Sequence, residues 1–170
     1  MTYSTYFPDK RHAGRLWKLG HGVSTDHLHP AKYFSLDQEI VNKGLFRGME
    51  GDLADCFAPG DILVAGRNFG CGSSREVCTR AMAGRGVAAV LAVSCARIFF
   101  RNMINTGILV IDGLPEETYE AVRTGEHGTI DLGDGFLLTE EGKLPIPVPE
   151  KSLLENTIRT VLTMGIHHEV

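Results

Sequence analysis

The sequence predicts an α/β domain in which a parallel or mixed sheet is flanked by helices. Three short apolar runs at residues 61–66, 86–93 and 107–112 are the main observation, because near-continuous apolar runs are typical of strands buried on both faces. Segments with helical apolar spacing separate these runs, so strand and helix alternate from residue 61 to residue 112. The 170 residues, 43% of them hydrophobic, are enough for one domain over 1–170 with its own core.

The elements follow one another in a regular order. Residues 17–36 are expected to form the end of a strand and then a long loop around Pro30. The segment 73–85 is expected to be a helix that ends at Gly84. The segment 94–107 is expected to be a second helix, with Ser94 as its N-cap and Gly107 at its end. The apolar stripes of these two helices consist of Val77, Ala81 and Met82 in the first, and Ile98, Phe99, Met103 and Ile104 in the second.

The last third of the chain has a different pattern. Residues 116–125 predict a short helix, and residues 128–149 alternate around Gly-Asp and Glu-Gly turns, which predicts hairpin strands. Residues 150–165 carry apolar side chains on one helical face and predict a closing amphipathic helix. No internal repeat or linker interrupts this order.

Composition excludes several classes of partner. The net charge is −4 and no run of Lys or Arg is long enough to form a basic stripe, which disfavours nucleic acid and anionic membranes as partners. The polar first 17 residues lack the apolar core of a signal peptide, and no apolar stretch is long enough to span a bilayer, so a cytoplasmic location is expected. The four cysteines show no C-x₂-C spacing and at least three of them are expected to be free thiols, and no metal site is predicted on this chain.

The stretch "GRNFGCGSSRE", residues 66–76, has the most specific chemistry. It lies between a predicted strand and a predicted helix, where α/β proteins bind ligands with free backbone N–H groups. Gly66, Gly70 and Gly72 allow positive φ or close approach to a ligand. Ser73 and Ser74 either cap the helix or offer hydroxyls to a substrate, and Arg75 suits a carboxylate. The capping alternative includes a capping box between Ser73 and Glu76.

Other Gly-rich motifs do not match this stretch. The lysine of the phosphate-binding G-x-x-x-x-G-K-[ST] loop is missing, and Arg75 stands where the third glycine of G-x-G-x-x-G would be. A nucleotide triphosphatase and a dinucleotide-dependent dehydrogenase are therefore not supported.

Three segments together resemble the small subunits of the aconitase superfamily, of the isopropylmalate dehydratase type. They are "STDHLHPAKYF", "GRNFGCGSSRE" and "GVAAVLAVSCARIFFRNMINTGILVI". The resemblance implies a swivelling β/β/α domain and a hydro-lyase that dehydrates a 2-hydroxy acid and rehydrates the product, as in leucine biosynthesis. It also implies that a larger partner holds a [4Fe–4S] cluster and that this chain binds no cofactor.

The resemblance places Ser73 at the position of the family's serine base. An unperturbed serine hydroxyl is a very poor base, so nearby positive charge and the helix N-terminal N–H groups are needed to activate it. Gly72, Ser74 and Arg75 are expected to bind substrate, with Arg75 as the carboxylate clamp. Asp26 and His27 match the family's T-D-x-x-x-P segment and are expected near the substrate; an ordinary Asx turn before Pro30 is the alternative for Asp26.

The family selects its substrate with the loop that follows this proline. Here that specificity loop contains Lys32, Tyr33, Phe34, Ser35 and Leu36. Its apolar side chains favour an alkyl substituent, because a carboxylate buried there without a partner is costly. Lys32 keeps a tricarboxylate open, and Val77 and Cys95 depart from the commonest family residues. Small subunits for dimethylmalate or for homoaconitate and homocitrate are therefore alternatives.

Two functions of other classes are also considered. A non-catalytic anion-binding module needs only the glycine-rich loop and would bind its ligand without a partner. A self-sufficient serine hydrolase is disfavoured, because the G-x-S-x-G elbow is absent. For the enzyme, we expect the chain alone to be inactive and residues 24–38 to become ordered on assembly.

Overall fold

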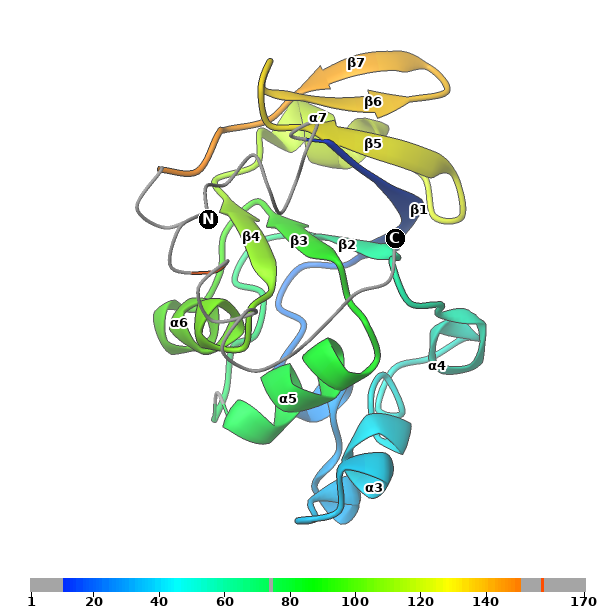
Figure 1. Ribbon diagram of the computed structural model, residues 1–170, viewed down its shortest axis with the longest axis vertical. Coiled ribbons are helices and arrows are strands. Elements are labelled where there is room, and N and C mark those ends of the chain that lie inside the picture. Colours follow the sequence, from blue (N-terminus) through cyan, green and yellow to red (C-terminus); the bar gives the residue numbers. More distant parts are fainter. Residues whose placement is uncertain (1–10, 74, 151–156, 158–170) are drawn as a thin grey trace.

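The computed structural model describes residues 11–73, 75–150 and 157. Its elements are β1 (Arg11–Leu19), α2 (Thr25–Leu28), the 3₁₀ helix η1 (Ala31–Tyr33), α3 (Gln38–Lys43), α4 (Leu53–Cys56), β2 (Ile62–Ala65), α5 (Glu76–Gly84), β3 (Ala89–Ala92), α6 (Arg97–Asn105), β4 (Leu109–Asp112), α7 (Glu116–Ala121), β5 (His127–Asp131), β6 (Phe136–Thr139) and β7 (Gly142–Pro145). The predicted α/β fold with a mixed sheet is confirmed (Figure 1).

The strands form one seven-stranded sheet in the order β4-β3-β2-β1-β5-β6-β7. Strands β1 to β4 run parallel to one another, whereas β5, β6 and β7 pair antiparallel. The parallel half brings the carboxyl ends of β1, β2 and β3 to one edge. The loops that follow these three strands therefore meet there.

Both faces of the parallel half are buried, which explains its continuous apolar runs. Leu63 and Ala65 of β2 face a core shared with α3, α4, α5 and α6, while Ile62 and Val64 belong to a second core that includes Tyr119 of α7. Figure 1 shows α5 and α6 on one side of these strands and the β5–β7 hairpins at the opposite end of the molecule. None of the helices in the described part of the chain is long and apolar enough to cross a membrane.

The structure corrects several boundaries. Helix α5 begins at Glu76, with Arg75 as its N-cap and no side-chain capping bond, so the alternative of a Ser73–Glu76 capping box is wrong. Helix α6 begins at Arg97 rather than Ser94. The Ser94 hydroxyl instead accepts a hydrogen bond from the Asn68 amide at 2.8 Å. Tertiary pairing of the loops delays both helix starts.

Three further segments differ from the expected pattern or lie outside the described residues. Ile98 was expected in the apolar stripe of α6, but its side chain is 64% exposed. The long loop expected around Pro30 is interrupted by α2, η1 and α3. The closing helix expected at 150–165 lies outside the described residues, apart from residues 150 and 157.

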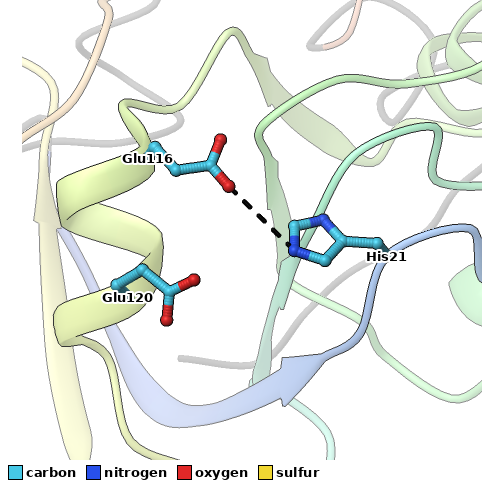
Figure 2. A group of neighbouring side chains, drawn as sticks. All are labelled: His21, Glu116 and Glu120. Carbon is cyan, nitrogen blue, oxygen red and sulfur yellow. Dashed lines mark ion pairs between the residues drawn. The ribbon is translucent and has the colours of Figure 1, made fainter.

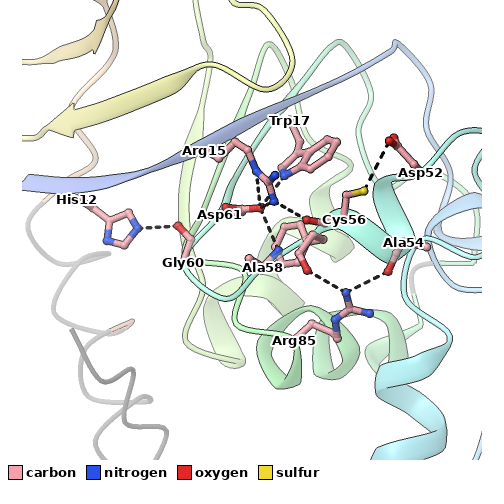
Figure 3. A network of polar contacts seen from close by, with 11 residues as sticks. His12, Arg15, Trp17, Asp52, Ala54, Cys56, Ala58, Gly60, Asp61 and Arg85 are labelled. Carbon is pink, nitrogen blue, oxygen red and sulfur yellow. Dashed lines mark hydrogen bonds and ion pairs between the residues drawn. The ribbon is translucent and has the colours of Figure 1, made fainter.

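A buried carboxylate joins β1 to the segment that precedes β2 (Figure 3). Asp61 is 6% exposed. Its Oδ2 accepts hydrogen bonds from Trp17 Nε1 at 2.7 Å, Arg15 Nη2 at 2.9 Å and the Ala58 amide at 3.0 Å. Arg15 Nη2 also donates to the Cys56 carbonyl. This network lies at the amino end of β2, away from the loops at the carboxyl ends.

A second buried carboxylate gives a pH-dependent contribution to stability. The Asp131 carboxyl accepts hydrogen bonds from the Asp134 amide at 3.1 Å and from Arg11 Nε at 2.8 Å. These bonds hold the pKa of Asp131 below its ordinary value. Because the folded pKa is depressed, the stabilisation is present above the unfolded pKa of about 4 and is lost as the pH falls through the folded pKa.

We therefore expect Asp131→Asn to cost stability at neutral pH and to cost much less at about pH 3, where the wild-type carboxyl is becoming protonated in the unfolded chain. Urea unfolding of both proteins at the two pH values measures this. Asp134→Asn is the matched control, because Asp134 contributes its backbone amide to this contact. A destabilisation by Asp131→Asn that is equal at both pH values would contradict the prediction.

Candidate active site

The glycine-rich loop, residues 66–75, follows β2 and lies between the segments that follow β1 and β3. On the β1 side, the Gly70 amide donates to the Val23 carbonyl at 2.8 Å and the Thr25 amide donates to the Cys71 carbonyl at 3.0 Å. These bonds continue the parallel pairing of β1 and β2 beyond their ends.

The β3 side holds the same loop in the same way. The Phe69 amide donates to the Ser94 carbonyl at 2.9 Å, and the Ala96 amide donates to the Phe69 carbonyl at 2.8 Å. Backbone hydrogen bonds thus fix the loop on both sides. This hydrogen-bonded part of the loop is a rigid platform for the residues at its end.

Two glycines shape this platform. Gly70 has φ 75°, and a Cβ there would overlap the Phe99 ring, so the position requires glycine for both reasons. Gly72 has φ 92° and directs the chain to Ser73. Gly66 does not have positive φ; it instead lies against the His21 ring.

Ser73 and Arg75 are both exposed beyond this platform, and Ser74 lies outside the described residues. Within the described ranges, no residue accepts a hydrogen bond from the Gly72 or Ser73 amide, and α5 lacks a side-chain cap. The Gly72 and Ser73 amides are therefore free donors among the described residues, and Ser73 precedes Arg75 and the positive end of the α5 dipole in the chain, a setting that favours anions.

Asp26 and His27 lie in α2, which is next to the loop. Ser24 caps this helix: its Oγ accepts from the His27 amide at 3.3 Å, and the His27 Nδ1 accepts from the Ser24 amide at 3.3 Å. His27 is thus part of a capping box, and Asp26 is an exposed residue of the first turn rather than part of an Asx turn. Their expected roles toward substrate stay predictions.

The specificity loop reaches the same place from α2. The Phe34 ring lies 4.7 Å from the Arg75 guanidinium carbon, so the structure brings one member of this loop to the predicted clamp. Lys32 Nζ lies 5.1 Å from the centre of the Tyr33 ring. The Leu36 side chain is 98% exposed, and Ser35 Oγ accepts from the Asp37 amide at 3.0 Å.

The sequence pattern does not single out two buried polar side chains in this region, Thr25 and His29. Thr25 is 3% exposed and His29 is 1% exposed. His29 Nε2 lies 2.7 Å from the Val41 carbonyl oxygen, whereas Thr25 Oγ1 and His29 Nδ1 have no partner among the described residues. The only sequence signal for the buried His29 is its place between Leu28 and Pro30, and this signal does not predict its contacts.

The cysteines do not assemble a cluster site. All four are free, and burial raises the pKa of the Cys78 and Cys95 thiols well above its ordinary value. Cys71 Sγ donates to the Gly22 carbonyl at 3.4 Å. No group of three cysteines lies within metal-binding distance among the described residues. An iron–sulfur cluster therefore does not fit the donor set of this chain.

His21, Glu116 and Glu120 form the one group of metal-ligating side chain types in the described ranges (Figure 2). The Arg67 amide donates to His21 Nδ1 at 2.9 Å, so the neutral ring carries its proton on Nε2, which faces Glu116 at 4.0 Å. Arg67 and Lys18 pair with the two glutamates at 2.9 and 3.6 Å. Each carboxylate is paired with a cation, and the histidine nitrogen that faces Glu116 carries the proton. These side chains are therefore better suited to hold α7 against the glycine-rich loop than to bind a metal.

Comparison with known proteins gives the family of this chain. The model of the aconitase C-terminal domain family matches residues 52–116. A 3-isopropylmalate dehydratase small subunit from Archaeoglobus fulgidus is 40% identical over 145 residues, which cover 82% of this chain and 86% of the relative. A homoaconitase small subunit from Thermus thermophilus is 39% identical over 143 residues, covering 83% and 86%.

A solved structure is also similar. The crystal structure of a 3-isopropylmalate dehydratase from Methanocaldococcus jannaschii matches with a TM-score of 0.77 at 30% identity, covering 91% of this chain and 97% of that one. The matched family segment contains β2, the glycine-rich loop and both following helices.

Proposed function

Because the chain belongs to the family of 3-isopropylmalate dehydratase small subunits within the aconitase superfamily, we propose that Ser73 is the base and Arg75 the carboxylate clamp of its reaction. The chain is the small subunit of an aconitase-type hydro-lyase, which acts together with a large subunit. Such an enzyme removes water from a 2-hydroxy acid and adds it back to the double bond. The proposal assigns the proton transfers of that reaction to this chain.

The position of Ser73 carries this proposal. It lies exposed at the end of a loop that is hydrogen-bonded on both sides, next to Arg75 and to the uncapped start of α5. A base removes a proton efficiently only if the substrate is held in a fixed orientation beside it. Arg75 binds a substrate carboxylate with similar strength before and during the proton transfer, while the Gly72 and Ser73 amides and the α5 dipole favour the deprotonated serine oxygen.

The remaining candidates bind and orient the substrate. Ser74 is assigned a hydrogen bond to the substrate, and Asp26 and His27 of α2, the helix next to the loop, are assigned further contacts with it. The His27 Nδ1 is engaged in the capping box. In the neutral ring this leaves its Nε2–H as a donor for a substrate.

The large subunit is proposed to hold the [4Fe–4S] cluster, since the cysteines of this chain do not gather. The cluster, when present there, supplies a Lewis acid for the substrate hydroxyl and carboxylate. We propose a heterodimer or a heterotetramer with the large subunit, and the cytoplasmic location expected from the sequence stays a prediction.

An alkylmalate is the substrate class that the specificity loop favours. Tyr33 and Leu36 offer apolar surface, and the Lys32 ammonium rests on the Tyr33 ring. A substrate carboxylate buried against these side chains without a partner would cost binding free energy. Since one relative is a homoaconitase small subunit, the tricarboxylate alternative deserves a direct comparison.

Anaerobic reconstitution with the large subunit tests the proposed function. Isopropylmalate, dimethylmalate, homocitrate and citrate are supplied in turn, and the unsaturated product is followed by its ultraviolet absorbance. We expect kcat/KM for an alkylmalate to exceed that for homocitrate at least about tenfold, and the chain alone to be inactive. A preference for homocitrate would refute the alkyl assignment, and inactivity on all four acids would favour the anion-binding module.

A further inference from the structure

Three side chains form a stack beside the candidate site. The His29 and Phe34 rings have centroids 5.6 Å apart and are nearly parallel, at 14°. The Arg75 guanidinium carbon lies 4.7 Å from the centre of the Phe34 ring. The stack begins in the buried core and ends at an exposed cation.

His29 is the fixed end of this stack. Its ring is 1% exposed. Since the Val41 carbonyl can only accept, His29 Nε2 donates the 2.7 Å hydrogen bond to it. Gly44 packs against the same ring: a Cβ there would lie 2.6 Å from His29 Nε2, so no larger residue fits. The ring is therefore held by α3 and by the turn that follows α3.

Arg75 is the end that needs support. Its side chain is exposed, and no acidic residue of the described ranges forms an ion pair with it. A long side chain without such a partner samples many rotamers, and ordering it on substrate binding costs entropy. A planar ring under the guanidinium restricts this sampling while leaving the N–H fork free for a carboxylate.

We propose that His29 and Phe34 are positioning residues that hold the Arg75 guanidinium in place for the substrate carboxylate. This inference rests on the role proposed above for Arg75. Phe34 then acts through Arg75 rather than as substrate-lining surface, because its ring is stacked by His29 and Arg75. Contact with an alkyl substituent falls to Tyr33 and Leu36. The specificity loop and the carboxylate clamp thereby act as one unit.

A double-mutant cycle in the reconstituted enzyme tests this coupling. Phe34→Leu removes the ring, Arg75→Gln removes the charge while keeping a donor, and the double variant closes the cycle. We expect Phe34→Leu to lower kcat/KM about two- to five-fold, the size of an exposed cation–π contact. The loss appears in KM with kcat nearly unchanged, because Arg75 binds ground state and transition state alike. Phe34→Tyr restores the wild-type KM.

In the Arg75→Gln background, Phe34→Leu is expected to have no further effect on KM. An equal loss in both backgrounds would mean that Phe34 contacts the substrate directly and would overturn the inference, as would an unchanged KM for Phe34→Leu. If Arg75→Gln itself leaves an active enzyme unaffected, the role proposed for Arg75 fails, which is a different result from a loss without coupling.

His29→Gln extends the test to the buried end of the stack. Glutamine keeps an N–H donor for the Val41 carbonyl and removes the ring, so the same rise in KM is expected. Thermal unfolding of each variant checks folding, because a smaller folded fraction lowers the apparent kcat and leaves KM unchanged. Phe136→Leu is the matched control: Lys143 Nζ lies 5.5 Å from the Phe136 ring, on a hairpin at the other end of the sheet. A wild-type KM for His29→Gln would remove His29 from the proposal.

Discussion

Ser73→Ala is expected to lower kcat of the reconstituted enzyme by about 10²- to 10⁴-fold, the range observed when a general base is removed. The side chain is exposed at the end of the glycine-rich loop, and the loop is held by backbone hydrogen bonds of Phe69, Gly70 and Cys71 rather than by the serine hydroxyl. The variant is therefore expected to keep its fold and its binding to the large subunit. KM is expected to change little, because Arg75 remains to bind the carboxylate.

The measurement is steady-state turnover of an alkylmalate, with thermal unfolding and size-exclusion chromatography of the assembled enzyme alongside. Thr139→Val is the matched control, because it removes a hydroxyl whose bond is to the Gly142 carbonyl within the β6–β7 turn. Its kcat should equal that of the wild type. A kcat for Ser73→Ala within a few-fold of wild type would exclude Ser73 as the base and leave helix-terminal anion binding as the role of the loop.

The alternation of strands and helices was predictable because it depends on the local spacing of apolar residues. The runs that became β2, β3 and β4 are apolar on both faces, and that is how a central parallel strand must look. The helix ends also followed from local chemistry, because a glycine with positive φ comes soon after each helix: Gly86 (φ 74°) after α5 and Gly107 (φ 82°) after α6.

The helix starts were not predictable, because distant partners decide them. Ser94 has the residue type of an N-cap, yet its hydroxyl and carbonyl bind the amides of Asn68 and Phe69 in the loop after β2. Helix α5 likewise starts late because Cys71 pairs with Ser24 and holds the chain extended. A residue with a local preference for capping a helix does not cap it when backbone groups of a neighbouring segment bind its side chain instead.

The candidate site divides in the same way. The motif around Ser73 predicted that this residue lies in the loop between a strand and a helix, because the residue types and their spacing are specific. The contact of Arg75 with Phe34 joins residues about forty positions apart, whereas Phe34 and His29 are close in the sequence. Both contacts depend on how α2 and α3 pack beside α5. Nothing in the local sequence of either segment specifies that arrangement.

Asp61→Ala is expected to be the most destabilising of the substitutions considered, by about 2–4 kcal/mol, because it removes the acceptor of a buried network. The Trp17 Nε1 proton and the Arg15 guanidinium lose their shared partner, and the Ala58 amide loses the bond that closes the turn before β2. For a chain of this size the fall in Tm is roughly 5–15 °C. Differential scanning calorimetry of the isolated subunit measures it.

The network also predicts which activity change should accompany the loss. Asp61 lies at the amino end of β2, whereas the glycine-rich loop follows the carboxyl end, so kcat and KM below the unfolding transition should stay close to wild type. Asp55→Ala is the control: its carboxylate, 68% exposed, pairs with Arg47 on the surface, and surface ion pairs contribute little to stability. Equal Tm values for the two variants would show that Asp61 is no more important than a surface carboxylate. A changed KM at full folding would show that strand β2 transmits changes at its amino end to Ser73 and Arg75.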